Sequence, residues 1–158
     1  MTVLVAGIGN IFLGDDAFGV EVVRRLAARD LPEGVQVADF GIRGFDLAHA
    51  LLDADSTAVL VDATPRGGEP GTLYLIEASV DAEEPEIEPH GMHPASVLRL
   101  VQALGGRPPR VLVVGCEPAT VDPDDFGQMG LSPPVEAAVD EAVRMIESLV
   151  ADIQGGVT

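Results

Sequence analysis

Carboxylate and imidazole side chains stand at three separate places in this chain where they could bind a divalent metal ion. Asp15 and Asp16 follow a glycine-rich turn, Asp62 follows a run of apolar residues, and His90 and His93 precede an amphipathic segment. Two carboxylates and one imidazole form a ligand set that suits a borderline ion such as Ni or Zn and leaves coordination positions open for another ligand. The chemistry requires folding to bring these three places together.

The glycine-rich turn matches a phosphate-binding loop only in part. The spacing from Gly9 to Gly14 is that of a P-loop, but Asp15 and Asp16 stand where that motif has Lys and Ser or Thr. The dinucleotide-binding pattern also fails, because its third glycine would fall at Phe12. The carboxylates would repel a phosphate, so the turn favours a cation or a proton. A module that binds nucleotides or sugar phosphates is the rival interpretation.

The elements that must position these residues follow from the hydrophobic pattern. Apolar runs alternate with amphipathic segments, which predicts an α/β fold with a mainly parallel sheet of five strands. Ser132 is expected to cap the last helix and Pro133 to open it. The predicted strands are Thr2–Ala6, Val35–Asp39, Thr57–Asp62, Gly71–Glu77 and Arg110–Gly115, and the predicted helices are Asp16–Ala28, Gly44–Leu52, Pro94–Leu104 and one that begins at Pro133.

Ligands of open α/β sheets bind beyond the C-terminal ends of the strands. The first predicted strand leads to Asp16, the third ends at Asp62, and an acid-rich loop ends at His90 just before the third helix. We therefore expect these three side chains to meet at one rim of the sheet.

The composition limits the classes of partner and the organisation of the chain. A length of 158 residues predicts a single α/β domain, which we place at 1–152, with a C-terminal tail at 153–158. The formal net charge of −17 argues against nucleic acids and anionic membrane surfaces as partners. The sequence shows neither a signal sequence nor a run of about twenty apolar residues, so we expect a cytoplasmic protein. The single cysteine, Cys116, excludes an intrachain disulfide.

Several of these residues also have a purely structural interpretation. Asp15 and Asp16 could stabilise the N-terminus of the first helix, and this role suits Asp15 better than Asp16. Asp62 could be an ordinary carboxylate at the end of a strand. We expect His49 to be structural or exposed, and Cys116 to be a small core residue rather than a nucleophile.

Four motifs in this order resemble the maturation endopeptidases of NiFe hydrogenases. The resemblance spans nearly the whole chain, and its first motif is fairly specific. The motifs are Gly7-Ile8-Gly9-Asn10 followed by Gly14-Asp15-Asp16-Ala17-Phe18-Gly19, then Asp62 after an apolar strand, then His90-Gly91-Met92, and finally Gly130-Leu131-Ser132-Pro133-Pro134-Val135.

The resemblance implies an endopeptidase that removes a C-terminal extension from a hydrogenase large-subunit precursor after nickel insertion. It implies a twisted sheet of five strands between helices, with Asp16, Asp62 and a histidine before the third helix as metal ligands. Counting back from the apolar pair in that helix selects His90, with His93 as second choice. Asp39, at the end of the second predicted strand, is a secondary candidate.

Two mechanisms fit these residues, and both make Asp16 and Asp62 the catalytic candidates. In one, a bound Ni or other divalent ion such as Zn polarises the scissile carbonyl or activates a water. In the other, which the resemblance favours, the nickel arrives with the substrate, the three residues recognise it, and a carboxylate activates the attacking water. A nickel-binding metallochaperone without proteolytic activity is a further rival function.

Overall fold

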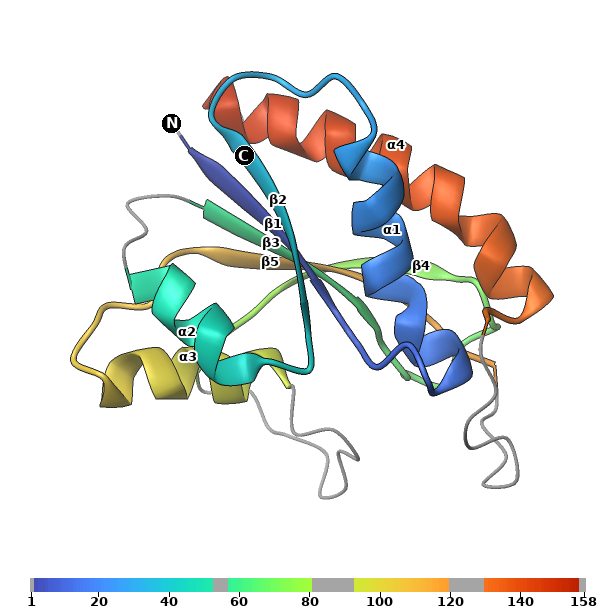
Figure 1. Cartoon of the computed structure of the whole chain (residues 1–158), viewed down its shortest axis with the longest axis horizontal. Helices are drawn as coiled ribbons and strands as arrows, with labels where there is room; N and C mark the ends of the chain where they lie inside the picture. Colours follow the sequence, from blue (N-terminus) through green and yellow to red (C-terminus); the bar gives the residue numbers. More distant parts are fainter. Residues whose placement is uncertain (1, 53–56, 81–92, 120–129, 157–158) are drawn as a thin grey trace.

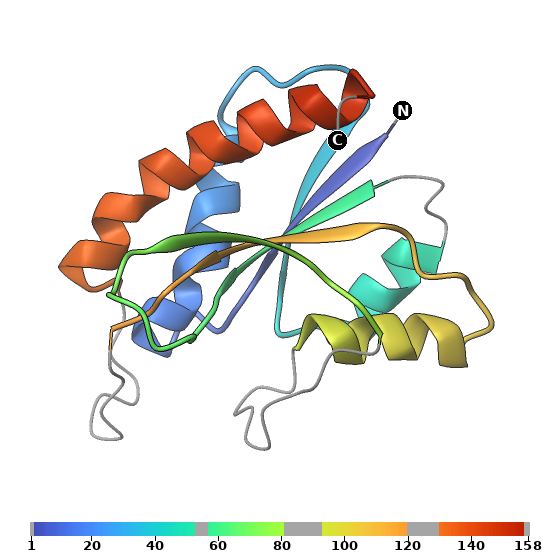
Figure 2. The ribbon, with the colours of Figure 1, turned by 180° about the vertical axis from the view of Figure 1, so that it is seen from behind.

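The computed structural model describes residues 2–52, 57–80, 93–119 and 130–156. Within these ranges, five strands form one twisted sheet in the order β2-β1-β3-β5-β4 (Figure 1). Four strands are parallel, and β4 pairs antiparallel with β5 at the edge seen in Figure 2. The strands are β1 (Val3–Ile8), β2 (Val35–Gly41), β3 (Thr57–Ala63), β4 (Leu73–Glu77) and β5 (Val111–Cys116). The predicted fold class is confirmed.

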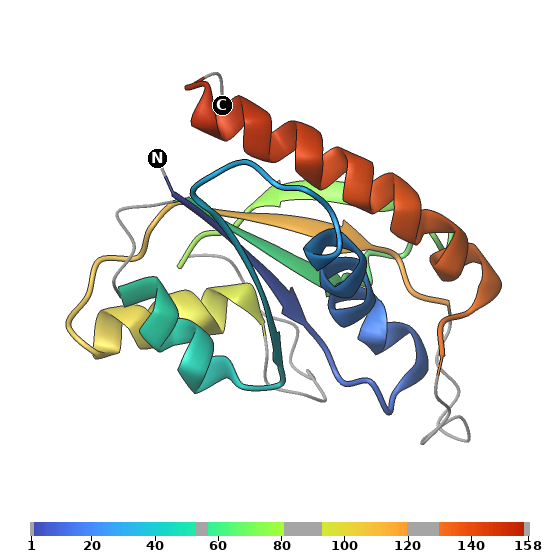
Figure 3. The same cartoon turned by 45° about the horizontal axis from the view of Figure 1, so that its top comes forward.

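Helices cover both faces of the sheet, so the protein has three layers (Figures 1 and 3). A short 3-10 helix, η1 (Gly14–Ala17), leads into α1 (Phe18–Ala27), and α1 packs beside the long helix α4 (Pro133–Gln154) on one face. The other face carries α2 (Gly44–Leu52) and α3 (Pro94–Ala103), which pack together. In the part of the chain that the structure describes, no helix is long and apolar enough to cross a bilayer.

The central strands are apolar at successive positions because both of their faces are buried. In β3, Val59 and Val61 belong to the core under α1 and α4, whereas Ala58 and Leu60 belong to the core under α2 and α3. Side chains alternate between the two faces of a strand, so a run without polar residues fits a strand between two helical layers. The same apolar runs in the sequence predicted a mainly parallel sheet.

Two elements differ from the sequence prediction at their ends. The first helix opens with the 3-10 turn η1 rather than as a regular α-helix. The tail expected from Ile153 onward is wrong at its start, because α4 continues through Gln154 and Ile153 is only 2% exposed. Ile153 follows Ile146 and Leu149 at helical spacing, so it extends the buried stripe of α4 by one more turn.

Candidate functional site

The order in which the chain adds strands to the sheet reverses between β1 and β3. The chain leaves β1 toward β2 on one side, while β3 lies on the other side of β1. Such a switch point opens the crevice in which open α/β sheets bind ligands. Asp16 lies in η1, directly after β1, and Asp62 lies near the end of β3. Because η1 packs against β3, the structure places the segments that carry these two carboxylates at the same edge of the sheet.

Asp16 is half-buried and is oriented by the turn that precedes it. Its Oδ2 accepts a hydrogen bond from the Asn10 N–H at 2.7 Å. A loop that binds phosphate would present such an N–H to its ligand, whereas here the protein's own carboxylate occupies it. This contact argues against the rival interpretation of the turn as a phosphate site.

The glycines of the turn are required by close backbone packing. Gly9 has φ +142°, and a Cβ there would lie 1.8 Å from the carbonyl oxygen of Asp16. A Cβ on Gly19 would lie 2.0 Å from the carbonyl oxygen of Val61. Only residues without a side chain allow η1 and α1 to approach the ends of β1 and β3 this closely. The glycine pattern therefore serves to hold Asp16 against the edge of the sheet.

Asp62 is half-buried at the second position from the end of β3. By the alternation of that strand it shares the face of Ala58 and Leu60, which is the face covered by α2 and α3. Its backbone carbonyl accepts a hydrogen bond from the Thr64 hydroxyl at 3.4 Å. The position near the end of a buried strand fixes the backbone of Asp62 and places it at the rim of the sheet.

The two candidate histidines differ in what the structure says of them. His90 lies outside the described residues. His93 is the N-cap of α3, and its Nδ1 accepts a hydrogen bond from the Ala95 N–H at 3.3 Å. One ring nitrogen of His93 therefore serves the helix terminus. Among the described residues, no group of three or more His, Cys, Asp and Glu side chains is arranged to hold a metal ion, so the ligand set of Asp16, Asp62 and His90 stays a prediction.

Asp39, the secondary candidate, lies exposed near the end of β2. Its Oδ1 accepts a hydrogen bond from the Gly41 N–H at 2.8 Å, and the Gly41 carbonyl accepts one from the Gly9 N–H at 2.9 Å. Through this chain of contacts Asp39 supports the backbone beside the glycine turn.

Asp15 lies in the first turn of η1, as the structural interpretation expected, but its carboxylate binds residues near the start of α4. It is 6% exposed and makes no capping bond to η1 or α1. Instead, Oδ1 accepts the Ser132 N–H at 2.7 Å, and Oδ2 accepts the Ser132 hydroxyl at 2.8 Å and the Ala119 N–H at 2.9 Å. Ser132 is the N-cap residue of α4, as predicted, but its side chain makes no capping bond to the helix, because the hydroxyl donates to Asp15 instead. Asp15 thus connects the end of the glycine-rich turn to the start of α4 through these hydrogen bonds.

Glu117, directly after β5, is a second buried carboxylate, and the sequence analysis did not single it out. It is 4% exposed, and it accepts hydrogen bonds from the backbone of Arg66 and Gly68 and from the Tyr74 hydroxyl, the last at 2.7 Å. Burial opposes ionisation, but these donors outweigh it and lower the pKa of Glu117 below its usual value. Glu117 therefore fixes the loop that follows Asp62. The only signal in the sequence is an acidic residue after a buried strand.

Replacement of Glu117 by Gln is expected to destabilise the protein in a pH-dependent way. Ionised Glu117 stabilises the fold above the unfolded-state pKa of about 4.3, and this contribution is lost as the pH falls through the lower folded-state pKa. We expect Glu117→Gln to lose about 1–3 kcal/mol at pH 7. Urea unfolding of both proteins at pH 7 and at low pH measures this, and an equal difference at both pH values would contradict it.

Cys116 and His49 behave as the sequence predicted. Cys116 is fully buried at the end of β5, where burial, together with the charge of Asp15, raises the pKa of its thiol to about 12. Such a thiol is a poor nucleophile at neutral pH. His49 is exposed on α2, and its ring lies edge-on to Phe45 at 4.7 Å between centroids. Cys116 lies at the carboxyl edge, paired with Ala63 of β3, but as a core residue.

The sequence is similar to known proteins along most of its length. The family of hydrogenase maturation proteases matches residues 20–149. The hydrogenase 2 maturation protease of Escherichia coli is 32% identical over 152 residues, which cover 92% of this chain and 88% of that protein.

The fold is similar to solved structures of the same kind. The structure of the hydrogenase maturating endopeptidase HybD from Escherichia coli superposes with a TM-score of 0.80 at 29% identity, covering 96% of this chain and 93% of the other. For HybD from Thermococcus kodakarensis, a [NiFe] hydrogenase maturation protease, the TM-score is 0.72 at 28% identity, with 94% and 99% covered.

Proposed function

Because this chain belongs to the hydrogenase maturation protease family, we propose that it is an endopeptidase that removes the C-terminal extension of a NiFe hydrogenase large-subunit precursor. The observation that carries the proposal is a similarity to maturation proteases that extends over 92% of the chain and includes the segments holding Asp16 and Asp62. Family membership supports peptide hydrolysis, and the nickel-loaded precursor is our proposed substrate.

In this proposal the nickel belongs to the substrate, and Asp16, Asp62 and His90 recognise it. Carboxylate oxygens from neighbouring strands at one crevice, with an imidazole, suit an ion that already has other ligands. The Asn10 N–H holds the Asp16 carboxylate in a fixed orientation, which lowers the entropic cost of binding. Only a precursor that carries its metal would then be held in position for cleavage.

Peptide hydrolysis needs a group that accepts a proton from the attacking water. Asp16 and Asp62 are carboxylates at the mouth of the crevice, and a positioned carboxylate performs this general-base role in hydrolases. The negative charge of the chain does not oppose this, because a metal-loaded substrate would supply positive charge to the two carboxylates.

The experiment that tests this function follows the mass of the large-subunit precursor during incubation with the purified protein. We expect the nickel-loaded precursor to lose a C-terminal peptide and the nickel-free precursor to stay intact. Transfer of nickel to the precursor without loss of mass would instead favour the metallochaperone. Equal cleavage of both precursors would overturn nickel recognition and leave peptidase activity standing.

A further inference from the structure

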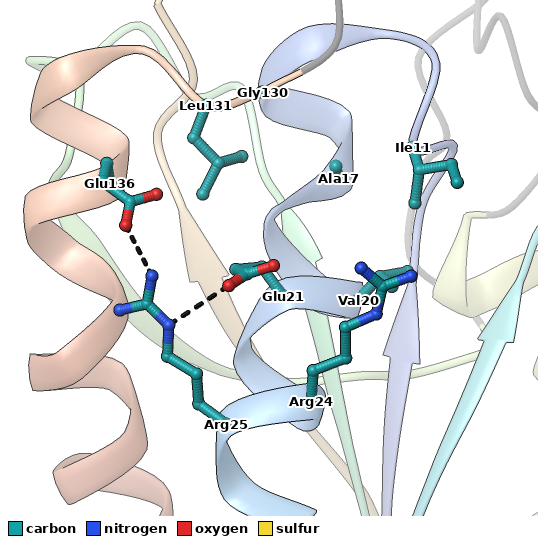
Figure 4. A pocket seen from close by; sticks show the side chains of 9 residues that line it. All are labelled: Ile11, Ala17, Val20, Glu21, Arg24, Arg25, Gly130, Leu131 and Glu136. Carbon is teal, nitrogen blue, oxygen red and sulfur yellow. Dashed lines mark hydrogen bonds and ion pairs between the residues drawn. The ribbon is translucent and has the colours of Figure 1, made fainter.

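A groove of about 270 Å³ lies between α1 and the first turn of α4, next to the glycine-rich turn that follows β1 (Figure 4). Its apolar lining comes from three separate elements: Ile11 in the turn, Val20 on α1 and Leu131 before α4. Ala17, the neighbour of Asp16 in the chain, also lines it. The groove therefore adjoins the turn that carries Asp16 at the carboxyl edge of the sheet.

The charged residues of the groove are not equivalent. Arg25 is held by Glu21 on its own helix and by Glu136 and Asp140 on α4, and the last two pairs join α1 to α4. Arg24 makes no hydrogen bond or ion pair with any residue that the structure describes. In Figure 4 its side chain lies along α1, with the guanidinium on the side of Val20 and Ile11. The Arg24 guanidinium, which has no ion-pair partner among the described residues, thus lies beside apolar side chains of the groove.

Positive charge is scarce in this chain, which has 9 basic residues against 26 acidic ones. The groove is lined by two arginines and two glutamates, so its formal charge is zero, but both glutamates pair with Arg25 and Arg24 is left as the cation that a carboxylate can reach. A nucleotide would bring several negative charges close to both glutamates. A peptide with one acidic side chain and apolar neighbours fits this arrangement better.

The distance along α1 sets where such an acidic residue would lie. Arg24 is seven residues beyond Ala17, a helical rise of roughly 10 Å. An extended peptide covers about 3.3 Å per residue. Because the Arg24 guanidinium lies back beside Val20 and Ile11 (Figure 4), a chain that passes Asp16 would reach it within about three residues.

We propose that this groove binds the C-terminal extension of the precursor, with an acidic side chain of the extension paired to Arg24 and its apolar neighbours against Ile11, Val20 and Leu131. The inference rests on the proposed function and names a determinant of its substrate. Arg24 then acts in binding and specificity, at a distance from the scissile bond.

Cleavage kinetics with the nickel-loaded precursor test the role of Arg24. We expect Arg24→Glu to raise KM about five- to tenfold, because an attractive charge pair becomes a repulsive one, and to leave kcat nearly unchanged. The acidic residues of the extension are then changed to Lys one at a time. At one position, the Lys-containing precursor is expected to restore the low KM with Arg24→Glu and to raise KM with the wild type.

Arg144→Glu is the matched control, because Arg144 is an exposed arginine of α4 that does not line the groove. It makes the same change in net charge and is expected to leave KM unaltered. Fluorescence anisotropy of a labelled extension peptide gives a second measurement that needs no catalysis. If the wild type cleaves and Arg24→Glu shows an unchanged KM and an unchanged peptide affinity, the proposed binding of the extension in this groove is overturned. A wild type that fails to cleave would overturn the proposed function.

Discussion

Asp62→Asn is expected to lower the rate of precursor cleavage at least about a hundredfold, the effect typical of losing a general base. The amide has nearly the same volume as the carboxylate but lacks its charge and its ability to accept a proton. Asp62 lies half-buried at the rim of β3, so this exchange is expected to leave the sheet in place. The rate of appearance of the cleaved large subunit, measured by mass spectrometry, checks the prediction, and thermal unfolding checks the fold.

The matched control is Asp152→Asn, which makes the same chemical change at an exposed position of α4. It is expected to cleave the precursor at the wild-type rate. Unaltered processing of the nickel-loaded precursor by Asp62→Asn would remove Asp62 from the mechanism, whatever the control does.

Asp15→Asn is expected to lower the free energy of unfolding by about 2–4 kcal/mol, because both oxygens of this buried carboxylate accept hydrogen bonds. An amide offers only one acceptor oxygen, and its NH2 group would face the N–H of either Ser132 or Ala119. A buried donor left without an acceptor has a large destabilising effect. Urea unfolding followed by circular dichroism measures the loss.

Asp30→Asn serves as the comparison, since Asp30 is exposed beyond the end of α1. Its effect on the free energy of unfolding is expected to stay within about 0.5 kcal/mol. A loss this small in Asp15→Asn as well would show that the bonds to Ser132 and Ala119 contribute little in solution.

Most of the fold could be predicted because its causes are local. The doubly buried strands are apolar without interruption, and α2 was predicted with the bounds that the structure gives it. The end of α4 was missed because Ile153 precedes a glycine-rich end, although its helical spacing from Leu149 already indicated burial. Helix ends depend on the surface that the last turn meets, which a local pattern describes less well.

The candidate site could be predicted only in part. Asp16 and Asp62 stood out because each follows an apolar strand, and parallel strands end at a common edge. The contacts of Asp15 and Glu117 could not be inferred, because the partners lie 104 and 117 residues away from Asp15 and 43 to 51 residues away from Glu117. No pattern of neighbouring residues encodes which backbone N–H groups a carboxylate will meet after folding.

The amino-acid sequence by itself determined the α/β architecture, the acidic charge and the two carboxylates at the ends of β1 and β3, because periodicity and composition act over a few residues at a time. The tertiary structure alone decided which acidic side chains are held in the interior, as Asp15 and Glu117 are, and that Arg25 rather than its neighbour Arg24 is held by acidic partners. Those roles depend on the donors and counter-charges that approach from distant segments, and only the packing of α1, α4 and the sheet brings them together.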